Sequence, residues 1–123
     1  MDQGSKVIAI VDDDPAMLDA IARLLTAHGF AVQVFTSAEA FLDARTANRA
    51  ACLVLDINLG GMSGIELRER LKSEGSQLPV IFMTGADSDA IRTQATNVGC
   101  VGFLRKPFAP GLLISAIAKA VES

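Results

Sequence analysis

The chain has 123 residues, a formal net charge of -3, 50% hydrophobic residues and 20% charged residues. At this length folding buries about two-thirds of the chain's surface, so a single domain over residues 1–123 can build a core without disulfides or a structural metal. The composition excludes disordered, fibrous and low-complexity classes, and two cysteines are too few for a disulfide framework or a metal cluster.

The N-terminal residues lack the basic start and the longer apolar stretch of a secretory signal, so we expect a cytoplasmic protein. No segment approaches the roughly 18 apolar residues of a membrane span. The 14 acidic residues outnumber the 11 basic ones, which leaves no positive field for a phosphate backbone. We therefore expect neither membrane binding nor direct binding of nucleic acid.

Five short runs that are apolar on both faces predict strands buried between two layers of helices. These runs cover residues 7–11, 31–35, 52–55, 80–83 and 101–104. Segments with helical periodicity follow each run, and Asp14, Ser37 and Ser63 are the predicted N-caps of the first three helices. The predicted helices run from Pro15 to the closing Gly29, from Ser37 to about residue 44, from Ser63 to about residue 72, from about 88 to 98, and from about 110 to the end of the chain.

Strands that alternate with helices through short connections predict an α/β domain. Five such units imply a parallel sheet with right-handed crossovers and helices on both faces. In sheets of this kind, ligands bind beyond the carboxyl ends of the strands. The residues at those ends are therefore the candidates for chemistry.

Acidic side chains gather at two of the predicted strand ends. Asp12, Asp13 and Asp14 follow the first strand, and Asp56 follows the third. Two like charges at 4 Å cost about 4 kcal/mol at an effective dielectric near 20, so such a cluster needs a counter-charge. Hard oxygen ligands without histidine or thiolate select Mg²⁺. Helix capping explains Asp14, but it does not explain Asp56, which ends a buried strand where an unpaired charge is costly.

Thr84 ends the fourth predicted strand and Lys106 follows the fifth. Lys106 could be a solvated surface lysine, but a charge beside a buried strand needs an acidic partner. We therefore expect it to supply positive charge to the cluster. Thr84 taken alone could be an ordinary strand-end cap.

As a set, these residues resemble the receiver domain of bacterial two-component response regulators over essentially the whole chain. The resemblance is carried by Asp12-Asp13, Asp56, Thr84-Gly85 and Lys106-Pro107, each after its strand. The sequences of residues 62–67 and 78–85 most resemble receivers of the nitrogen-fixation and nitrate regulator group. The resemblance implies a flavodoxin-like fold with five helices and strand order 2-1-3-4-5.

The resemblance also implies that Asp56 accepts a phosphoryl group from a phosphohistidine of a sensor histidine kinase. It implies an Mg²⁺ cofactor held by Asp13, by Asp12 directly or through water, by Asp56, and by the backbone carbonyl of Asn58. Chemistry would be limited to self-catalysed phosphoryl acceptance and autodephosphorylation. The domain would be a signalling switch and not an enzyme that acts on a separate substrate.

In the family, the lysine pairs with phosphoryl oxygens and the threonine donates its hydroxyl to one of them, which implies these roles for Lys106 and Thr84. An aromatic side chain three residues before the lysine then turns inward, and here that residue is Phe103. Phe103 could equally be an ordinary core residue, and the same side chain can do both. Because phenylalanine carries no hydroxyl, we expect it to favour the buried rotamer even without phosphate.

The face formed by the fourth helix, fifth strand and fifth helix is the usual output and dimer face of the family. On the last helix we expect one stripe to pack on the sheet, made of Leu113, Ala116, Ile117 and Ala120. A second apolar stripe remains, made of Ile114, Ala118 and Val121. We predict that this second stripe contacts a downstream partner, an output domain or a second copy. The alternative is incidental exposure of small apolar residues.

Two features depart from the family pattern. Gly60 stands where the family often has proline, so the loop after Asp56 is expected to be more mobile. Asn58 and Ala86 occupy the positions that tune how water reaches the acyl phosphate, and they leave its lifetime undetermined.

Two other functions compete with the switch. A phosphatase of the haloacid dehalogenase type also uses an Mg²⁺-bound aspartyl nucleophile, but it needs a general acid two residues later, where this chain has Asn58. A receiver-like adaptor that never needs phosphate is the second rival, and the intact Asp13, Asp56, Thr84 and Lys106 argue against it.

Overall fold

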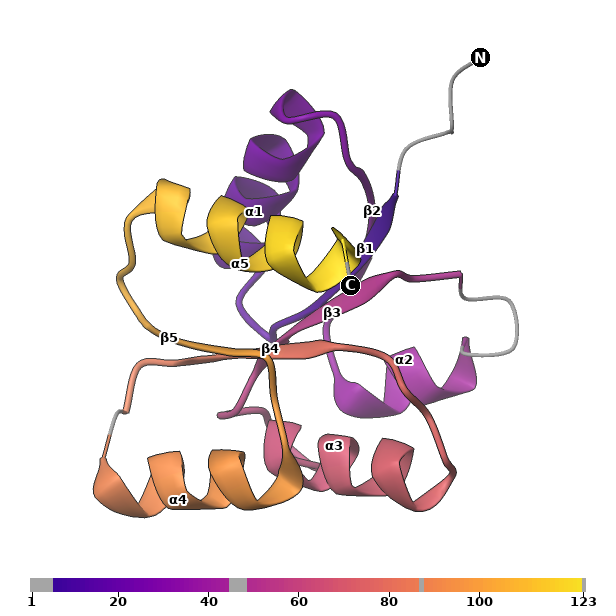
Figure 1. Ribbon diagram of the computed structural model, residues 1–123, viewed down its shortest axis with the longest axis vertical. Coiled ribbons are helices and arrows are strands. Elements are labelled where there is room, and N and C mark those ends of the chain that lie inside the picture. Colours follow the sequence, from indigo (N-terminus) through magenta and orange to yellow (C-terminus); the bar gives the residue numbers. More distant parts are fainter. Residues whose placement is uncertain (1–5, 45–48, 87, 123) are drawn as a thin grey trace.

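The structure is a computed structural model that describes residues 6–44, 49–86 and 88–122. A five-stranded sheet lies at its centre, with strand order β2-β1-β3-β4-β5 and parallel pairing throughout (Figure 1). The strands are β1 (Val7–Val11), β2 (Ala31–Phe35), β3 (Cys52–Asp56), β4 (Val80–Thr84) and β5 (Gly102–Arg105). The predicted α/β class and strand order are confirmed.

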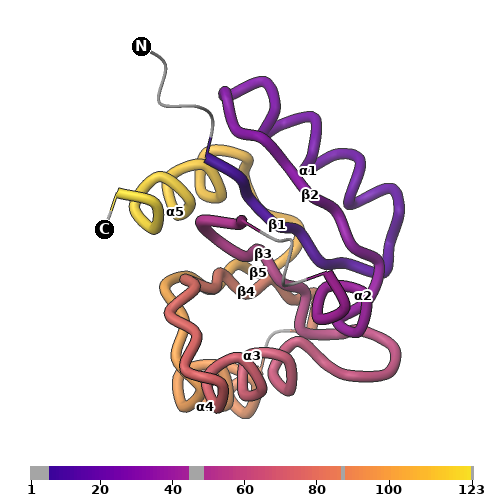
Figure 2. Tube along the Cα trace, turned by 90° about the vertical axis from the view of Figure 1, so that its right-hand side faces the viewer, coloured from indigo at the N-terminus to yellow at the C-terminus, as the bar shows by residue number. Residues whose placement is uncertain are grey.

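The helices cover both faces of the sheet. They are α1 (Pro15–Ala27), α2 (Ala38–Asp43), α3 (Gly64–Ser73), α4 (Asp89–Val98) and α5 (Pro110–Glu122). Helices α1 and α5 lie on one face and α2, α3 and α4 on the other, a separation that the turned view in Figure 2 also shows. The predicted N-caps Asp14, Ser37 and Ser63 are confirmed, since each side chain accepts a hydrogen bond from a backbone N–H of its first turn.

Successive strand residues point to opposite faces of the sheet and so feed two separate cores. Ala9 and Val11 belong to the core beneath α2, α3 and α4, whereas Ile8 and Ile10 belong to the core beneath α1 and α5. Strands β3 and β4 are buried along their whole length. The polar residues at the carboxyl ends of β3 and β4 are therefore attached to two fully buried strands.

Four strand boundaries differ from the prediction, since the fifth strand also ends one residue later than expected, at Arg105. β3 and β4 each extend by one residue, so Asp56 and Thr84 belong to the sheet, where they pair with Met83 and Arg105. The fifth strand begins one residue late, because Val101 lies outside it and is 58% exposed. The apolar character of Val101 predicts burial, but whether a residue is buried depends on how its neighbours pack.

Helix α5 is partly as predicted and partly different. Its expected core stripe does pack on the sheet, with three buried members and a half-buried one: Leu113, Ile117, Ala120 and Ala116. The predicted second stripe is half-buried instead of open to solvent: Ile114, Ala118 and Val121. Ile114 and Val121 pack against the core beneath α1 and α5. The large apolar side chain that α5 exposes is Leu112, at 56%.

Within the described ranges, no helix is both long enough and apolar enough to cross a membrane.

Candidate functional site

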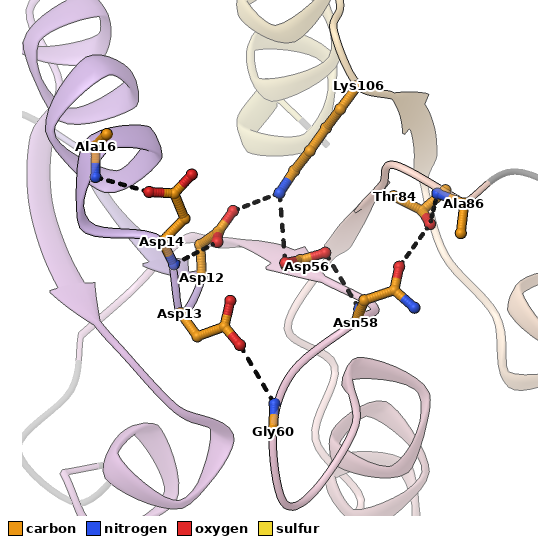
Figure 3. Close-up of polar contacts among 10 residues, drawn as sticks. All are labelled: Asp12, Asp13, Asp14, Ala16, Asp56, Asn58, Gly60, Thr84, Ala86 and Lys106. Carbon is orange, nitrogen blue, oxygen red and sulfur yellow. Dashed lines mark hydrogen bonds and ion pairs between the residues drawn. The ribbon is translucent and has the colours of Figure 1, made fainter.

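The carboxyl ends of four strands carry polar side chains to one edge of the sheet (Figure 3). Asp12 follows β1, Asp56 ends β3, Thr84 ends β4, and Lys106 follows β5. Asp12, Asp56 and Thr84 are buried, and they are the buried polar side chains of the described residues. The structure thus places together the strand-end residues that the sequence singled out.

Three carboxylates converge at this edge. Asp12, Asp13 and Asp56 each offer an oxygen, and these oxygens all lie within 4.8 Å of one another. Local turns hold two of them: the backbone N–H of Asp14 donates to Oδ1 of Asp12 at 2.9 Å, and that of Asn58 donates to Oδ1 of Asp56 at 3.1 Å. Asp13, by contrast, is exposed. The cluster is therefore an acidic pocket with two buried members and one at its mouth.

Lys106 bridges the two buried carboxylates. Its Nζ lies 2.7 Å from Oδ2 of Asp12 and 3.3 Å from Oδ2 of Asp56, and its side chain is only 18% exposed. Burial lowers the pKa of Lys106, but the hydrogen bond to Asp12 and the charges of both carboxylates outweigh burial and raise the pKa above its usual value. Lys106 thus has two acidic partners where one was expected, and its ammonium stays charged.

The acidic pocket keeps an excess of negative charge. The pKa of Asp56 is raised, first by burial and then by the charge of Asp12, and Lys106 only partly offsets these effects. Three carboxylates face one ammonium, so Lys106 alone does not neutralise the cluster. The remaining negative charge favours binding of a further cation.

The hydroxyl of Thr84 makes two hydrogen bonds, and its implied bond to a phosphoryl oxygen stays a prediction. Its hydroxyl donates to Oδ1 of Asn58 at 2.9 Å and accepts from the backbone N–H of Ala86 at 3.0 Å (Figure 3). The hydroxyl is thus directed at Asn58, not at Asp56. Sequence reasoning placed Asn58 at a metal-ligand and water-tuning position but missed its contact with Thr84, because the two residues are 26 positions apart.

The loop after Asp56 is held by two carboxylates from other parts of the chain. The backbone N–H of Gly60 donates to Oδ2 of Asp13 at 3.4 Å, and that of Met62 donates to Oε2 of Glu39 at 3.0 Å. No sequence pattern pointed to Glu39, which is an ordinary acidic residue in the first turn of α2. The greater mobility expected from Gly60 stays a prediction.

Comparison with known proteins accounts for this arrangement. The family model described as the response regulator receiver domain matches residues 8–118. The chain belongs to this family. Receiver domains are signalling switches of two-component response regulators and not enzymes in the usual sense, so the resemblance read from the sequence is confirmed.

Two curated relatives illustrate the family. Transcriptional regulatory protein FixJ of Bradyrhizobium diazoefficiens is 40% identical over 115 residues, which cover 94% of this chain and 56% of FixJ. Response regulator protein TodT of Pseudomonas putida is 36% identical over 122 residues, which cover 99% of this chain and 54% of TodT. The receiver thus spans about half the length of the curated relatives it matches. The FixJ match confirms the likeness to the nitrogen-fixation regulators.

A solved structure agrees with the fold. The crystal structure titled FixJ-N has a TM-score of 0.89 and 36% sequence identity, and the match covers 98% of this chain and 96% of that one. Strand order and helix placement in the receiver therefore follow a fold that is already known from experiment.

Phe103 of this receiver is half-buried and packs against the core beneath α2, α3 and α4. The guanidinium of Arg92 lies 4.8 Å from the centre of its ring. The ring neither points freely into solvent nor is fully buried. Its expected preference for the buried rotamer therefore stays a prediction.

Proposed function

We propose that Asp56 of this receiver accepts a phosphoryl group from a phosphohistidine of a sensor histidine kinase, and that the signal leaves through α4, β5 and α5. The observation that carries the proposal is the convergence of three carboxylates, that of Asp56 among them, with a lysine that contacts two of them. Membership of the receiver family supports the same function. The proposed setting is the cytoplasm, with no direct contact to nucleic acid or membrane.

The proposed reaction is a displacement at phosphorus. A carboxylate oxygen of Asp56 forms a bond to phosphorus while the bond from phosphorus to the donor imidazole nitrogen breaks. The nitrogen leaves with the electron pair and takes up a proton, and the product is an acyl phosphate. Lys106, whose Nζ lies 3.3 Å from Oδ2 of Asp56, is close enough to pair with the phosphoryl oxygens during transfer.

The donor set fits Mg²⁺, because it consists of hard oxygen ligands and carries surplus negative charge. Asp13 and Asp56 would hold the ion, together with the backbone carbonyl of Asn58. The Lys106 ammonium lies closer to Asp12, at 2.7 Å, than to Asp56, at 3.3 Å, so contact through a water suits Asp12 best. When bound, the ion would neutralise charge on the phosphoryl oxygens.

The proposed switch requires Thr84 to exchange one partner for another. Its hydroxyl now donates to Asn58 and would donate to a phosphoryl oxygen instead. Phe103 would then turn inward and give up its contact with Arg92. A cation–π contact at an exposed site is worth only about 0.5–1 kcal/mol, so its loss does not prevent the movement.

The proposed output surface is the face of α4, β5 and α5, where a homodimer partner or an output domain would bind. The second stripe of α5 contributes the apolar edge of this face: Ile114, Ala118 and Val121. Ile114→Glu together with Val121→Lys is expected to weaken self-association or partner binding. Unchanged self-association and partner binding in the double variant would remove this surface from the proposal.

The direct test is incubation of the chain with Mg²⁺ and a small phosphoryl donor, followed by intact mass measurement. We expect the wild type to gain one phosphate and Asp56→Asn to gain none. Asp19→Asn is the matched control, because it removes the carboxylate of an exposed aspartate on α1 that pairs only with Arg23 in the described structure.

Absence of a gain in the wild type, or an equal gain in Asp56→Asn, would contradict the proposal. Continuous release of inorganic phosphate from organic phosphate esters would instead favour the phosphatase. A phosphate gain in Asp19→Asn equal to that of the wild type shows that loss of one negative charge does not by itself prevent the reaction.

A further inference from the structure

The loop between β3 and α3 carries Asn58, and its two ends are fixed by backbone contacts. At the start, the backbone N–H of Asn58 donates to the side-chain Oδ1 of Asp56 at 3.1 Å, and at the end the N–H of Gly64 donates to the carbonyl of Ile57 at 3.0 Å. Between them lies the glycine pair at 60 and 61, the part with the greatest conformational freedom in the unbound chain. The backbone of Asn58 leads directly into this tip, so we expect the path of the tip to affect the position of the Asn58 carbonyl.

Two carboxylates hold the tip, and only one of them is independent of the acidic pocket. Asp13 accepts from Gly60 at 3.4 Å, but Asp13 is also one of the three clustered carboxylates, so the two roles compete. Glu39 accepts from Met62 at 3.0 Å and is not a member of that cluster. The contact from Glu39 can therefore persist when a cation binds.

The helix that carries Glu39 is held in place by its N-cap and by buried side chains. Ser37 caps α2, and its side chain accepts from the N–H of Ala40 at 3.0 Å. Ala38 and Phe41, on either side of Glu39, are buried in the core beneath α2, α3 and α4. The carboxylate is thus presented to the loop by a helix that the core holds in place.

Glycine at position 61 favours the approach of Glu39 to the loop. Its φ is +74°, in the left-handed region, and a Cβ placed there would lie 2.9 Å from Oε2 of Glu39. Position 61 thus has a backbone conformation that favours glycine, and a side chain there would contact Glu39. The loop tip and Glu39 fit one another closely.

We infer that Glu39 is a positioning residue for the phosphorylation site: it holds the loop tip so that Asn58 is ordered before a cation binds. This inference rests on the proposed function of the acidic pocket. Without Glu39 the tip has to become ordered on binding, which reduces affinity without removing any ligand. Loss of partners that orient metal ligands typically costs about 10–100-fold in affinity, and we expect about three- to tenfold here because Glu39 acts through the loop backbone.

The test is calorimetric titration with Mg²⁺ of the wild type, Glu39→Ala, Glu39→Gln and Asp43→Ala. Asp43 is an exposed aspartate at the other end of α2, so its removal changes net charge equally without touching the loop. We expect about three- to tenfold weaker binding in Glu39→Ala, partial recovery in Glu39→Gln, which keeps an acceptor oxygen, and wild-type affinity in Asp43→Ala. Hydrogen exchange at the Met62 amide is expected to accelerate in Glu39→Ala alone.

A second pair of variants tests the contact from the loop side. Gly61→Ala and Gly75→Ala both place a side chain at a positive φ, +74° and +78°, but only the first meets Glu39. We expect Gly61→Ala to weaken Mg²⁺ binding and Gly75→Ala to leave it unchanged. Adding Glu39→Ala to Gly61→Ala is expected to bring little further loss, because residues that share one contact are not additive.

The outcomes separate the inference from the proposed function. If the wild type does not bind Mg²⁺, the proposed function itself fails. If the wild type binds but Glu39→Ala binds as well, or Asp43→Ala weakens binding equally, the positioning role is overturned. The positioning role would also be overturned if the losses of Mg²⁺ affinity in the Glu39 and Gly61 variants were fully additive.

Discussion

Lys106 and Thr84 flank Asp56 on different sides, and different forces hold them (Figure 3). Lys106 is held by charge, with two buried carboxylates at 2.7 Å and 3.3 Å. Thr84 is held by neutral hydrogen bonds, one to the side chain of Asn58 and one from the backbone of Ala86.

The difference matters for a switch. Removing one partner from a buried charged group leaves an uncompensated charge, whereas a neutral hydrogen bond contributes only about 1 kcal/mol net. We call the contacts of Lys106 with Asp12 and Asp56 the charged side of the site, and the hydrogen bonds of Thr84 the neutral side. The charged side is therefore expected to stay in place and the neutral side to rearrange. Four predictions test this contrast, beginning with the largest effect.

Lys106→Met breaks the charged side. Without metal, we expect the free energy of unfolding to fall by about 3 kcal/mol, because Asp12 and Asp56 are left buried without a counter-ion. Urea unfolding followed by circular dichroism measures it, since the chain has no Trp or Tyr for fluorescence. Lys72→Met, at an exposed lysine on α3, is the control and should change little. Equal effects of the two variants would show that the bridge stabilises nothing.

Mg²⁺ is expected to reinforce the charged side. At a free concentration ten times its Kd, the ion should stabilise the wild type by about 1.4 kcal/mol, and a chelator should reverse the gain. Lys106→Met should gain more, because its acidic pocket has lost the competing ammonium. Thermal unfolding with and without the ion measures both effects. A gain that survives in Asp13→Ala would place the ion elsewhere.

Asp56→Asn is expected to relieve repulsion within the charged side. Because the folded-state pKa of Asp56 is raised, wild-type stability falls as pH rises from about 4 through that pKa, where the unfolded chain ionises first. The variant escapes this loss. Without metal, it should be more stable by about 1 kcal/mol near pH 7, and the advantage should shrink toward pH 4. Unfolding curves across this pH range check the trend, and an advantage that grows toward acid pH would contradict it.

Thr84→Val breaks the neutral side and is expected to have the smallest effect. It removes the hydrogen bonds to Asn58 and from Ala86, and we expect a loss of about 0.5–1 kcal/mol in unfolding free energy. Thr84→Ser keeps the hydroxyl and serves as the control. A loss as large as that of Lys106→Met would mean that the two sides of the site are equally rigid.

Most of the fold could be predicted because it depends on local rules. The caps at Asp14, Ser37 and Ser63 form within one helical turn, and an apolar run between polar ends predicts a strand. Burial of the strand was not predictable in the same way: β2 and β5 were expected to be buried but are only partly buried, because they lie at the edges of the sheet, and Val34 of β2 is 49% exposed. The failure at Val101 has the same origin, since an apolar residue at the end of a run carries no sign of its own exposure.

The site was predictable in its membership but not in all its contacts. The rule that parallel strands bring their carboxyl ends to one edge was enough to assemble Asp12, Asp56, Thr84 and Lys106. The partner of the Thr84 hydroxyl depended on where the loop after β3 runs, and no local pattern encodes that path.

The sequence by itself determined the elements, their order along the chain and the polar residues at the strand ends, because periodicity and capping act over a few residues. Only the tertiary structure decided that Glu39 reaches Met62, and that Ile114 and Val121 are half-buried. These outcomes join residues far apart in sequence or depend on neighbouring elements, so they exist only once the helices have packed on the sheet.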